Sequence, residues 1–164
     1  MIYYIHGFRS SCSSRKATAF DFAKCIEYSE DDLNNGKVFE MISKINNEDI
    51  VIGSSLGGFL ALTTDAHVKI LLNPAISVDG LMRYGDFFEF VERAKKKELK
   101  FNKSYAFISK NDEIIEHNID YLMNKCKELY IIDDDHRFTK RFNVVLSAVK
   151  SIILYELGKD KEDS

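Results

Sequence analysis

Residues 50–59 read Ile-Val-Ile-Gly-Ser-Ser-Leu-Gly-Gly-Phe. The three β-branched residues at the start are typical of a short strand that is buried on both faces of a parallel sheet. The pattern Gly53-x-Ser55-x-Gly57 then fits a nucleophile elbow, a tight turn between a strand and a helix that holds a serine at its tip. Apolar residues from Leu56 onward predict the helix, and the N–H groups at its start favour negative charge that develops beside Ser55.

Two other interpretations of this turn are open from the motif alone. Ser55 could cap the helix without any catalytic role, or the glycines could bind a phosphate group. The phosphate interpretation is the weaker one, because the stretch has neither the G-x-x-x-x-G-K-[ST] spacing nor the G-x-G-x-x-G spacing.

The chain has 164 residues, of which 45% are hydrophobic, and this is enough for one domain with a sizeable core. We expect a single domain over residues 1–158 and a flexible charged tail over residues 159–164. The net charge of −3 gives no electrostatic reason to expect nucleic acid or a membrane surface as a partner. The start of the chain lacks the features of a signal peptide, and no apolar run approaches the roughly 20 residues that cross a bilayer. We therefore expect a cytoplasmic protein.

The three cysteines, Cys12, Cys25 and Cys126, are odd in number and widely spaced. They match neither a disulfide framework nor a C-x-x-C metal or redox site. We therefore expect them to be buried free thiols.

Hydrophobic patterning divides the chain into alternating strands and helices. Strands are expected at 2–5, 50–52, 68–72, 105–108 and 129–132, with a weaker one near 26–29. Helices are expected at 15–26 after the cap Ser14, at 38–45, after Ser55, at 80–100, at 119–126, and from 138 until Gly158 ends the last one. This alternation predicts a doubly wound α/β domain, a mostly parallel sheet with helices on both faces.

In such a sheet the loops that follow the strands share one edge, where ligands bind. Ser55, Asp112 and His136 each follow a strand, and their order along the chain is that of α/β hydrolases. A serine hydroxyl needs a base within hydrogen-bond reach and a carboxylate that orients the base. We therefore predict Ser55 as the nucleophile, His136 as the base and Asp112 as the acid. Glu113 is an alternative acid, and taken singly Asp112 also fits a turn residue and His136 a solvated histidine.

An oxyanion hole needs two main-chain N–H groups, which we expect from Leu56 and from Phe8 in the loop after the first strand. His6 and Gly7 are then structural, with Gly7 allowing the sharp turn at the substrate, and His6 as a general base is a minor alternative. Of the other histidines, His67 precedes its strand at the opposite edge and His117 lies beside a helix.

Aromatic residues supply candidates for an apolar wall around the acyl group. They are Phe8, Phe87 and Phe88, with Gly7 beside them as part of the substrate site. Aromatic residues at helical spacing are more often part of the core, and this interpretation stays open.

Five motifs along the chain together match the pattern of a known family. They are His6-Gly7-Phe8 with Ser10, Ser11, Ser14, Lys16 and Ala17, then Gly53-Ser54-Ser55-Leu56-Gly57-Gly58, Asn73-Pro74-Ala75, Asp112-Glu113, and His136 with Phe138. Together they resemble the YqiA-like esterases, a small α/β-hydrolase family, over almost the whole chain. The resemblance implies a minimal α/β-hydrolase fold without the first two strands of the full fold. It also implies carboxylesterase activity on a small acyl ester or acyl thioester, with Ser55, Asp112 and His136 as the triad and no cofactor or metal.

The chain departs from this family pattern in front of His136, where it has Asp133-Asp134-Asp135 in place of a neutral pair. If these carboxylates face the ring, they favour the imidazolium and weaken the base near neutral pH. The acidic run also leaves open a non-catalytic binding protein that keeps the turn only for architecture. A metal site at residues 133–136 is a further alternative, although consecutive aspartates point in different directions. Thioesterase or acyltransferase activity is the nearest variant of the esterase hypothesis.

Overall fold

The computed structural model describes residues 1–162. In chain order the elements are β1 (Ile2–Ile5), α1 (Arg15–Ala19), β2 (Lys24–Ile26), α2 (Glu30–Asn34), α3 (Val38–Ile42), β3 (Ile50–Ser54), α4 (Leu56–Leu62), β4 (Val68–Leu72), the 3-10 helix η1 (Asp79–Tyr84), α5 (Phe88–Lys95), β5 (Ser104–Ser109), α6 (Ile119–Lys125), β6 (Glu128–Ile132) and α7 (Phe142–Glu162).

The six strands form one sheet in the order β2-β1-β3-β4-β5-β6, and every neighbouring pair is parallel. The central strands β3 and β4 are buried along their whole length, as expected for strands covered on both faces. The register pairs Gly53 with Ile5 and with Leu71, so the ends of β1, β3 and β4 lie side by side. The predicted doubly wound, parallel α/β fold is confirmed.

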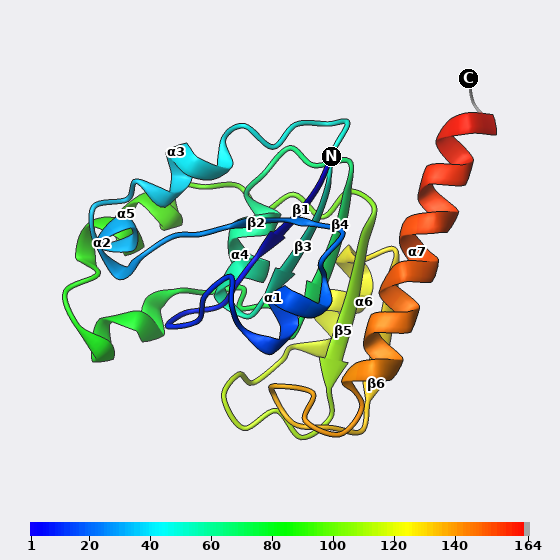
Figure 1. The fold of residues 1–164 in the computed structure, drawn as a ribbon. Coiled ribbons are helices and arrows are strands. Elements are labelled where there is room, and N and C mark those ends of the chain that lie inside the picture. Colours follow the sequence, from blue (N-terminus) through cyan, green and yellow to red (C-terminus); the bar gives the residue numbers. More distant parts are fainter. Residues whose placement is uncertain (163–164) are drawn as a thin grey trace.

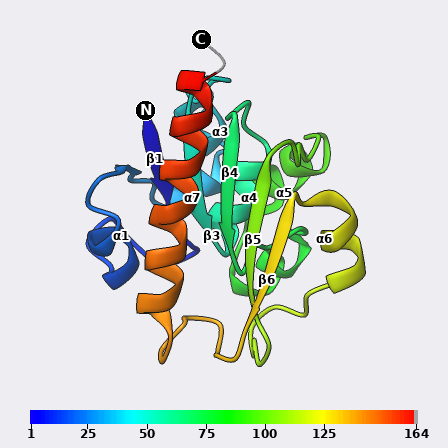
Figure 2. The ribbon, with the colours of Figure 1, turned by 90° about the vertical axis from the view of Figure 1, so that its right-hand side faces the viewer.

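The two faces of the sheet pack against different helices, because successive side chains of a strand point to opposite faces. One apolar cluster joins the sheet to α1 and α7, and the other joins it to the segment from α2 to α6. Figure 1 shows α7 along one side of the sheet and α2, α3 and α5 on the other. Figure 2 shows the loops that follow β5 and β6 together at the bottom of the sheet, below the start of α7.

Several predicted helix boundaries are wrong. The helix expected at 15–26 ends at Ala19, because Phe20 turns into the core between Tyr4 and Phe142 and the chain then enters β2. The weak strand expected near 26–29 lies slightly earlier, at Lys24–Ile26.

The helix expected at 80–100 is two shorter helices, η1 and α5, and Gly85 between them has a φ of 155° that no helix can continue through. The helix expected at 38–45 ends at Ile42. The last helix does not end at Gly158 but continues to Glu162, so residues 159–162 of the expected tail are helical. Residues 163–164 of that tail lie outside the described part of the chain.

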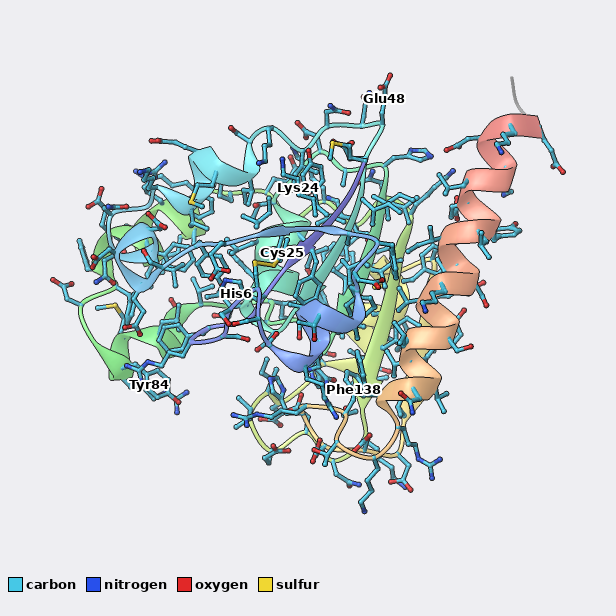
Figure 3. The ribbon with its side chains drawn as sticks, viewed as in Figure 1. His6, Lys24, Cys25, Glu48, Tyr84 and Phe138 are labelled. Carbon is cyan, nitrogen blue, oxygen red and sulfur yellow. A yellow bond between two sulfur atoms is a disulfide. The ribbon has the colours of Figure 1, made fainter. Side chains whose placement is uncertain are left out.

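The expectation of three free thiols is also wrong, because Cys12 and Cys25 form a disulfide. Cys25 lies in β2, which pairs with β1 in parallel, and Cys12 lies in the loop that leaves β1. The sheet thus brings the two Cα atoms to 5.8 Å, within the range for a disulfide. The sulfur–sulfur bond is visible beside the Cys25 label in Figure 3. Cys126 is a free cysteine, and burial raises the pKa of its thiol to about 11.

Candidate active site

Ser55 occupies the turn between β3 and α4. Its φ of 56° and ψ of −116° lie in a region that residues other than glycine rarely adopt. Close main-chain contacts hold this turn. A Cβ atom on Gly57 would lie 2.0 Å from the carbonyl oxygen of Ile5, and one on Gly53 would lie 2.3 Å from the carbonyl oxygen of Gly57. Glycine is therefore required at both positions for the start of α4 to reach the end of β1.

The edge of the sheet brings together the three side chains predicted to act as a unit. Nε2 of His136 lies 3.2 Å from Oγ of Ser55, and Nδ1 of His136 lies 2.8 Å from Oδ2 of Asp112. The side chain of Asp112 is 2% exposed and that of His136 is 11% exposed. A partly open histidine between a serine and a buried carboxylate has the geometry needed to accept a proton from the serine and to return it.

The carboxylate of Asp112 accepts four hydrogen bonds. Oδ1 accepts from the main-chain N–H groups of Ile114 at 2.9 Å and Ile115 at 2.8 Å, and Oδ2 contacts His136 and also Nε2 of His117 at 2.7 Å. Burial alone raises the pKa of Asp112, but the hydrogen bonds from His117, His136 and the two N–H groups outweigh it and hold this pKa well below its usual range. Asp112 is therefore ionised at neutral pH.

Sequence reasoning missed His117, which it placed beside a helix without a role. The residue lies five positions after Asp112, in the loop that precedes α6. Nothing in the local pattern marks it, because its approach to Asp112 depends on how this loop folds back over the end of β5.

Glu113, the alternative acid, contacts the main chain of His136 and not its ring. Its Oε2 accepts a hydrogen bond from the N–H of His136 at 3.1 Å. This contact helps to place the loop that carries the histidine.

Asn73 and Ser109 also hold the histidine loop, and sequence reasoning missed this role of both. Nδ2 of Asn73 donates to the carbonyl oxygen of His136 and to Oγ of Ser109, each at 2.8 Å, and its Oδ1 accepts from the N–H of Ser109 at 2.7 Å. Oγ of Ser109 donates to the carbonyl oxygen of Asp135 at 2.5 Å. The only sequence signal was the Asn73-Pro74 pair at the end of β4, where Asn73 has a left-handed φ of 45°.

The acidic run before His136 does not face its ring. Asp134 accepts hydrogen bonds from the N–H groups of residues 135, 140 and 141, and Asp135 accepts from the N–H groups of residues 137 and 139. Oδ1 of Asp133 accepts from the side chain of Asn111. These carboxylates shape the loop between β6 and α7, so the condition under which they would weaken the base is not met. Within residues 1–162, no group of three His, Cys, Asp or Glu side chains is arranged to hold a metal ion.

The two N–H groups expected in the oxyanion hole are at the same place in the fold. A Cβ atom on Gly7 would lie 3.4 Å from Cβ of Ser55, so the turn that leads into Phe8 lies directly against Ser55. Leu56 follows Ser55 as the first residue of α4. Over the described residues, neither the N–H of Phe8 nor that of Leu56 donates a hydrogen bond to another part of the chain. Both donors are therefore unpaired beside Ser55.

His6 is buried within the core. Its ring stacks on that of Tyr28 with a centroid distance of 4.1 Å, and its Nδ1 donates to the carbonyl oxygen of Gly7 at 2.8 Å. Among the described residues, its ring forms no hydrogen bond with Ser55.

The candidate aromatic wall is brought together only in part. The ring of Phe8 lies 5.4 Å from that of Phe87, which is buried, and 5.6 Å from that of Tyr84. Phe88 is 60% exposed and makes no ring contact with Phe8. Sequence reasoning did not select Tyr84, which lies at the outer end of η1, on the left of Figure 3. The guanidinium of Arg9 covers the rings of both Phe8 and Tyr84.

A family model described as "Uncharacterised protein family (UPF0227)" matches residues 1–153. The chain belongs to this family. This match confirms the resemblance to the YqiA-like family that the sequence motifs suggested. Among proteins with curated descriptions, none matches this UPF0227 chain.

Solved structures with the same fold include α/β hydrolases. Est1E from Butyrivibrio proteoclasticus has a TM-score of 0.71 at 15% identity, covering 96% of this chain and 88% of its own. Mouse alpha/beta hydrolase domain-containing protein 10 has a TM-score of 0.66 at 16% identity, covering 93% of this chain and 88% of its own. A second structure of Est1E, with bound ferulic acid, has a TM-score of 0.67 at 14% identity and covers 96% of this chain and 89% of its own. At these identities the likeness establishes the α/β-hydrolase fold. Through residues 1–162, none of the helices combines the length and the apolar character needed to cross a bilayer.

Proposed function

We propose that this UPF0227 protein is a serine hydrolase that cleaves small acyl esters through an acyl-enzyme intermediate. The observation that carries the proposal is the unbroken series of contacts from Oγ of Ser55 through both ring nitrogens of His136 to Oδ2 of Asp112. The fold shared with esterases such as Est1E supports it.

In the proposed mechanism, Oγ of Ser55 attacks the acyl carbonyl while Nε2 of His136 takes the hydroxyl proton. Asp112 keeps the ring oriented and stabilises the imidazolium that forms. The N–H groups of Phe8 and Leu56, which are unpaired, donate to the oxygen that becomes negative in the tetrahedral intermediate. The imidazolium then protonates the leaving alcohol, and a water molecule activated by the same ring releases the acid.

The substrate side of the site is expected to be the aromatic cluster of Phe8, Tyr84 and Phe87, next to Gly7. Phe8 joins this cluster to the oxyanion loop, so an apolar acyl group at Ser55 would meet its ring first. Phe88 is too exposed to enclose an acyl chain and would act only at the rim. Short-chain p-nitrophenyl esters and a feruloyl ester are suitable first substrates, the latter because an Est1E structure holds ferulic acid. A thioester in the same series tests the thioesterase variant.

The test compares wild type, Ser55→Ala, His136→Ala and Ser54→Ala in ester hydrolysis from pH 6 to 9. Loss of the nucleophile from a triad that works as a unit lowers kcat by a factor on the order of 10⁵ or more, and loss of the base has a similar effect. Ser54 is the matched control, because it is the buried neighbouring serine at the end of β3. We expect Ser54→Ala to remain active and to react with a fluorophosphonate probe. Wild-type turnover in purified Ser55→Ala would refute the triad, and folded wild type that neither hydrolyses any ester nor reacts with the probe would favour a binding protein.

A further inference from the structure

The acid of the proposed triad is shared between two histidines. Oδ2 of Asp112 lies 2.8 Å from Nδ1 of His136 and 2.7 Å from Nε2 of His117. The side chain of His117 is 5% exposed, so its contact with the carboxylate is shielded from water. An ionised carboxylate can only accept hydrogen bonds, so Nε2 of His117 must carry a hydrogen.

The orientation of Asp112 does not depend on His117. Its other oxygen, Oδ1, is held by two main-chain N–H groups, those of Ile114 and Ile115. These donors belong to the turn directly after β5 and fix the plane of the carboxylate. The contact from His117 therefore changes mainly the charge on Oδ2 that is available to His136.

We propose that His117 is a positioning residue that acts through Asp112. The hydrogen bond from its Nε2 reduces the negative charge on Oδ2 that would otherwise stabilise the protonated ring of His136. In this way it favours the unprotonated ring of His136 that accepts the serine proton, and it extends the activity of the enzyme toward acidic conditions. This inference rests on the proposed hydrolase function, because it concerns the base of the same site.

Other charged groups lie near Asp112 and His136 and also affect the charge at the site. Lys16 on α1 attracts the charge of Asp112, and burial together with the neighbouring Arg15 and Arg137 lowers the pKa of Lys16 to about 8. Glu113 accepts the main-chain N–H of His136, and Lys110 and Glu116 line a cavity of about 300 Å³ beside His117. None of these groups lies between His117 and Oδ2 of Asp112, which are in direct contact.

The cavity makes His117 suitable for substitution. Besides polar residues, its lining contains isoleucines, among them Ile115, Ile119 and Ile131, so an apolar ring at position 117 has apolar neighbours. A phenylalanine at position 117 keeps the ring and its packing but removes the donor. A glutamine keeps a side-chain N–H donor of comparable reach. The pair His117→Phe and His117→Gln therefore separates the hydrogen bond from the packing.

The experiment measures kcat/KM for a p-nitrophenyl ester between pH 4.5 and 9 in wild type and in both variants. Without the donor, Asp112 favours the imidazolium of His136 more strongly, so the acidic limb of the profile should move to higher pH by roughly one unit in His117→Phe. We expect His117→Gln to keep the limb near that of wild type. A limb that is unchanged in His117→Phe, or that moves to lower pH, overturns the inference.

Nuclear magnetic resonance supplies a readout that does not need turnover, and its first measurement uses the wild type alone. In wild type labelled with ¹⁵N at histidine, Nε2 of His117 should be protonated at neutral pH, and an unprotonated Nε2 overturns the inference. In His117→Phe, the ring of His136 should take up its proton at higher pH than in wild type. If the wild type is inactive, the proposed function fails. If the wild type is active but the acidic limb of the kcat/KM profile is unchanged in His117→Phe, only the role assigned to His117 is contradicted.

Discussion

Replacing Asn73 with alanine should destabilise the protein and slow the reaction, although Asn73 touches no substrate. The amide makes three side-chain hydrogen bonds, to the main chain of His136 and to both the hydroxyl and the N–H of Ser109. A typical hydrogen bond contributes about 1 kcal/mol, so removing three costs about 3 kcal/mol. Alanine at the left-handed φ of 45° adds about 1 kcal/mol. We therefore expect the free energy of unfolding to fall by about 4 kcal/mol.

The kinetic effect of Asn73→Ala follows from the loop that it releases. Without the hydrogen bond to its carbonyl oxygen, His136 is held mainly by Asp112 and Glu113. A displacement of about 1 Å in a catalytic group can lower the rate on the order of 100-fold. We expect kcat for ester hydrolysis to fall by about this factor with little change in KM, because the aromatic cluster at Phe8 is untouched.

Urea unfolding measures the stability and ester hydrolysis measures the rate, with Asn102→Ala as the matched control. Nδ2 of Asn102 donates a single hydrogen bond, to the carbonyl oxygen of Ala66, near the opposite edge of the sheet. Its loss should cost about 1 kcal/mol and leave kcat unchanged. If Asn73→Ala loses less than about 1 kcal/mol, or loses stability without any effect on kcat, the bridging part assigned to Asn73 is wrong.

Two further predictions concern stability. Because the pKa of Asp112 is lowered in the folded state, its contribution to stability is complete above its unfolded value of about 3.9 and is lost as the pH falls from there toward the lower folded value. The urea midpoint of Asp112→Asn should therefore depend less steeply on pH below about 4 than that of wild type, and equal slopes would contradict the hydrogen-bonded anion. Replacing Cys12 and Cys25 together with serine opens a loop closed over a separation of 13 residues, which should cost about 3 kcal/mol in urea unfolding and remove the dependence of stability on reductant. Cys126→Ser keeps the disulfide, so it should lose stability on reduction as the wild type does. Equal stability of the double variant and oxidised wild type would show that the disulfide does not constrain the chain.

The sheet could be predicted because its signal is local. Apart from β2, the strands contain short apolar runs that end at a glycine or a polar residue, and the rule that parallel strands share a carboxyl edge then selects Ser55, Asp112 and His136. The lengths of the helices could not be predicted in the same way. Periodicity continues through Phe20, and only the packing of Phe20 against Tyr4 shows that the first helix stops before it. Gly158 predicted the end of the last helix, yet that helix continues to Glu162.

The disulfide and the contacts of His117 and Asn73 could not be predicted from the sequence, for a different reason. Cys12 and Cys25 become neighbours only because β2 returns parallel to β1, which the pattern near 26–29 suggested too weakly to use. The contacts of His117 and Asn73 depend on the path of irregular loops, where no periodicity exists to read. The sequence shows that Asp133-Asp134-Asp135 departs from the family pattern. It does not show which groups these carboxylates contact, and in the structure Asp134 and Asp135 accept hydrogen bonds from main-chain N–H groups.

The end of β4 contributes no group to the proposed chemistry, yet it ties the reactive loops together. The N–H of Ser55 donates to the carbonyl oxygen of Leu72 at 2.9 Å, and the N–H of Ala75 donates to the carbonyl oxygen of Ser55 at 3.0 Å. The strained turn is thus bonded on both sides to the chain that leaves β4, while Asn73 between them holds the main chain of His136. Ser55 and His136, the proposed nucleophile and base, are therefore both bonded to one short segment, Leu72 to Ala75. This shared anchor helps a protein of this size to hold Ser55, with its positive φ, against a histidine from a distant loop, while Asp112 and Glu113 fix the histidine from the other side.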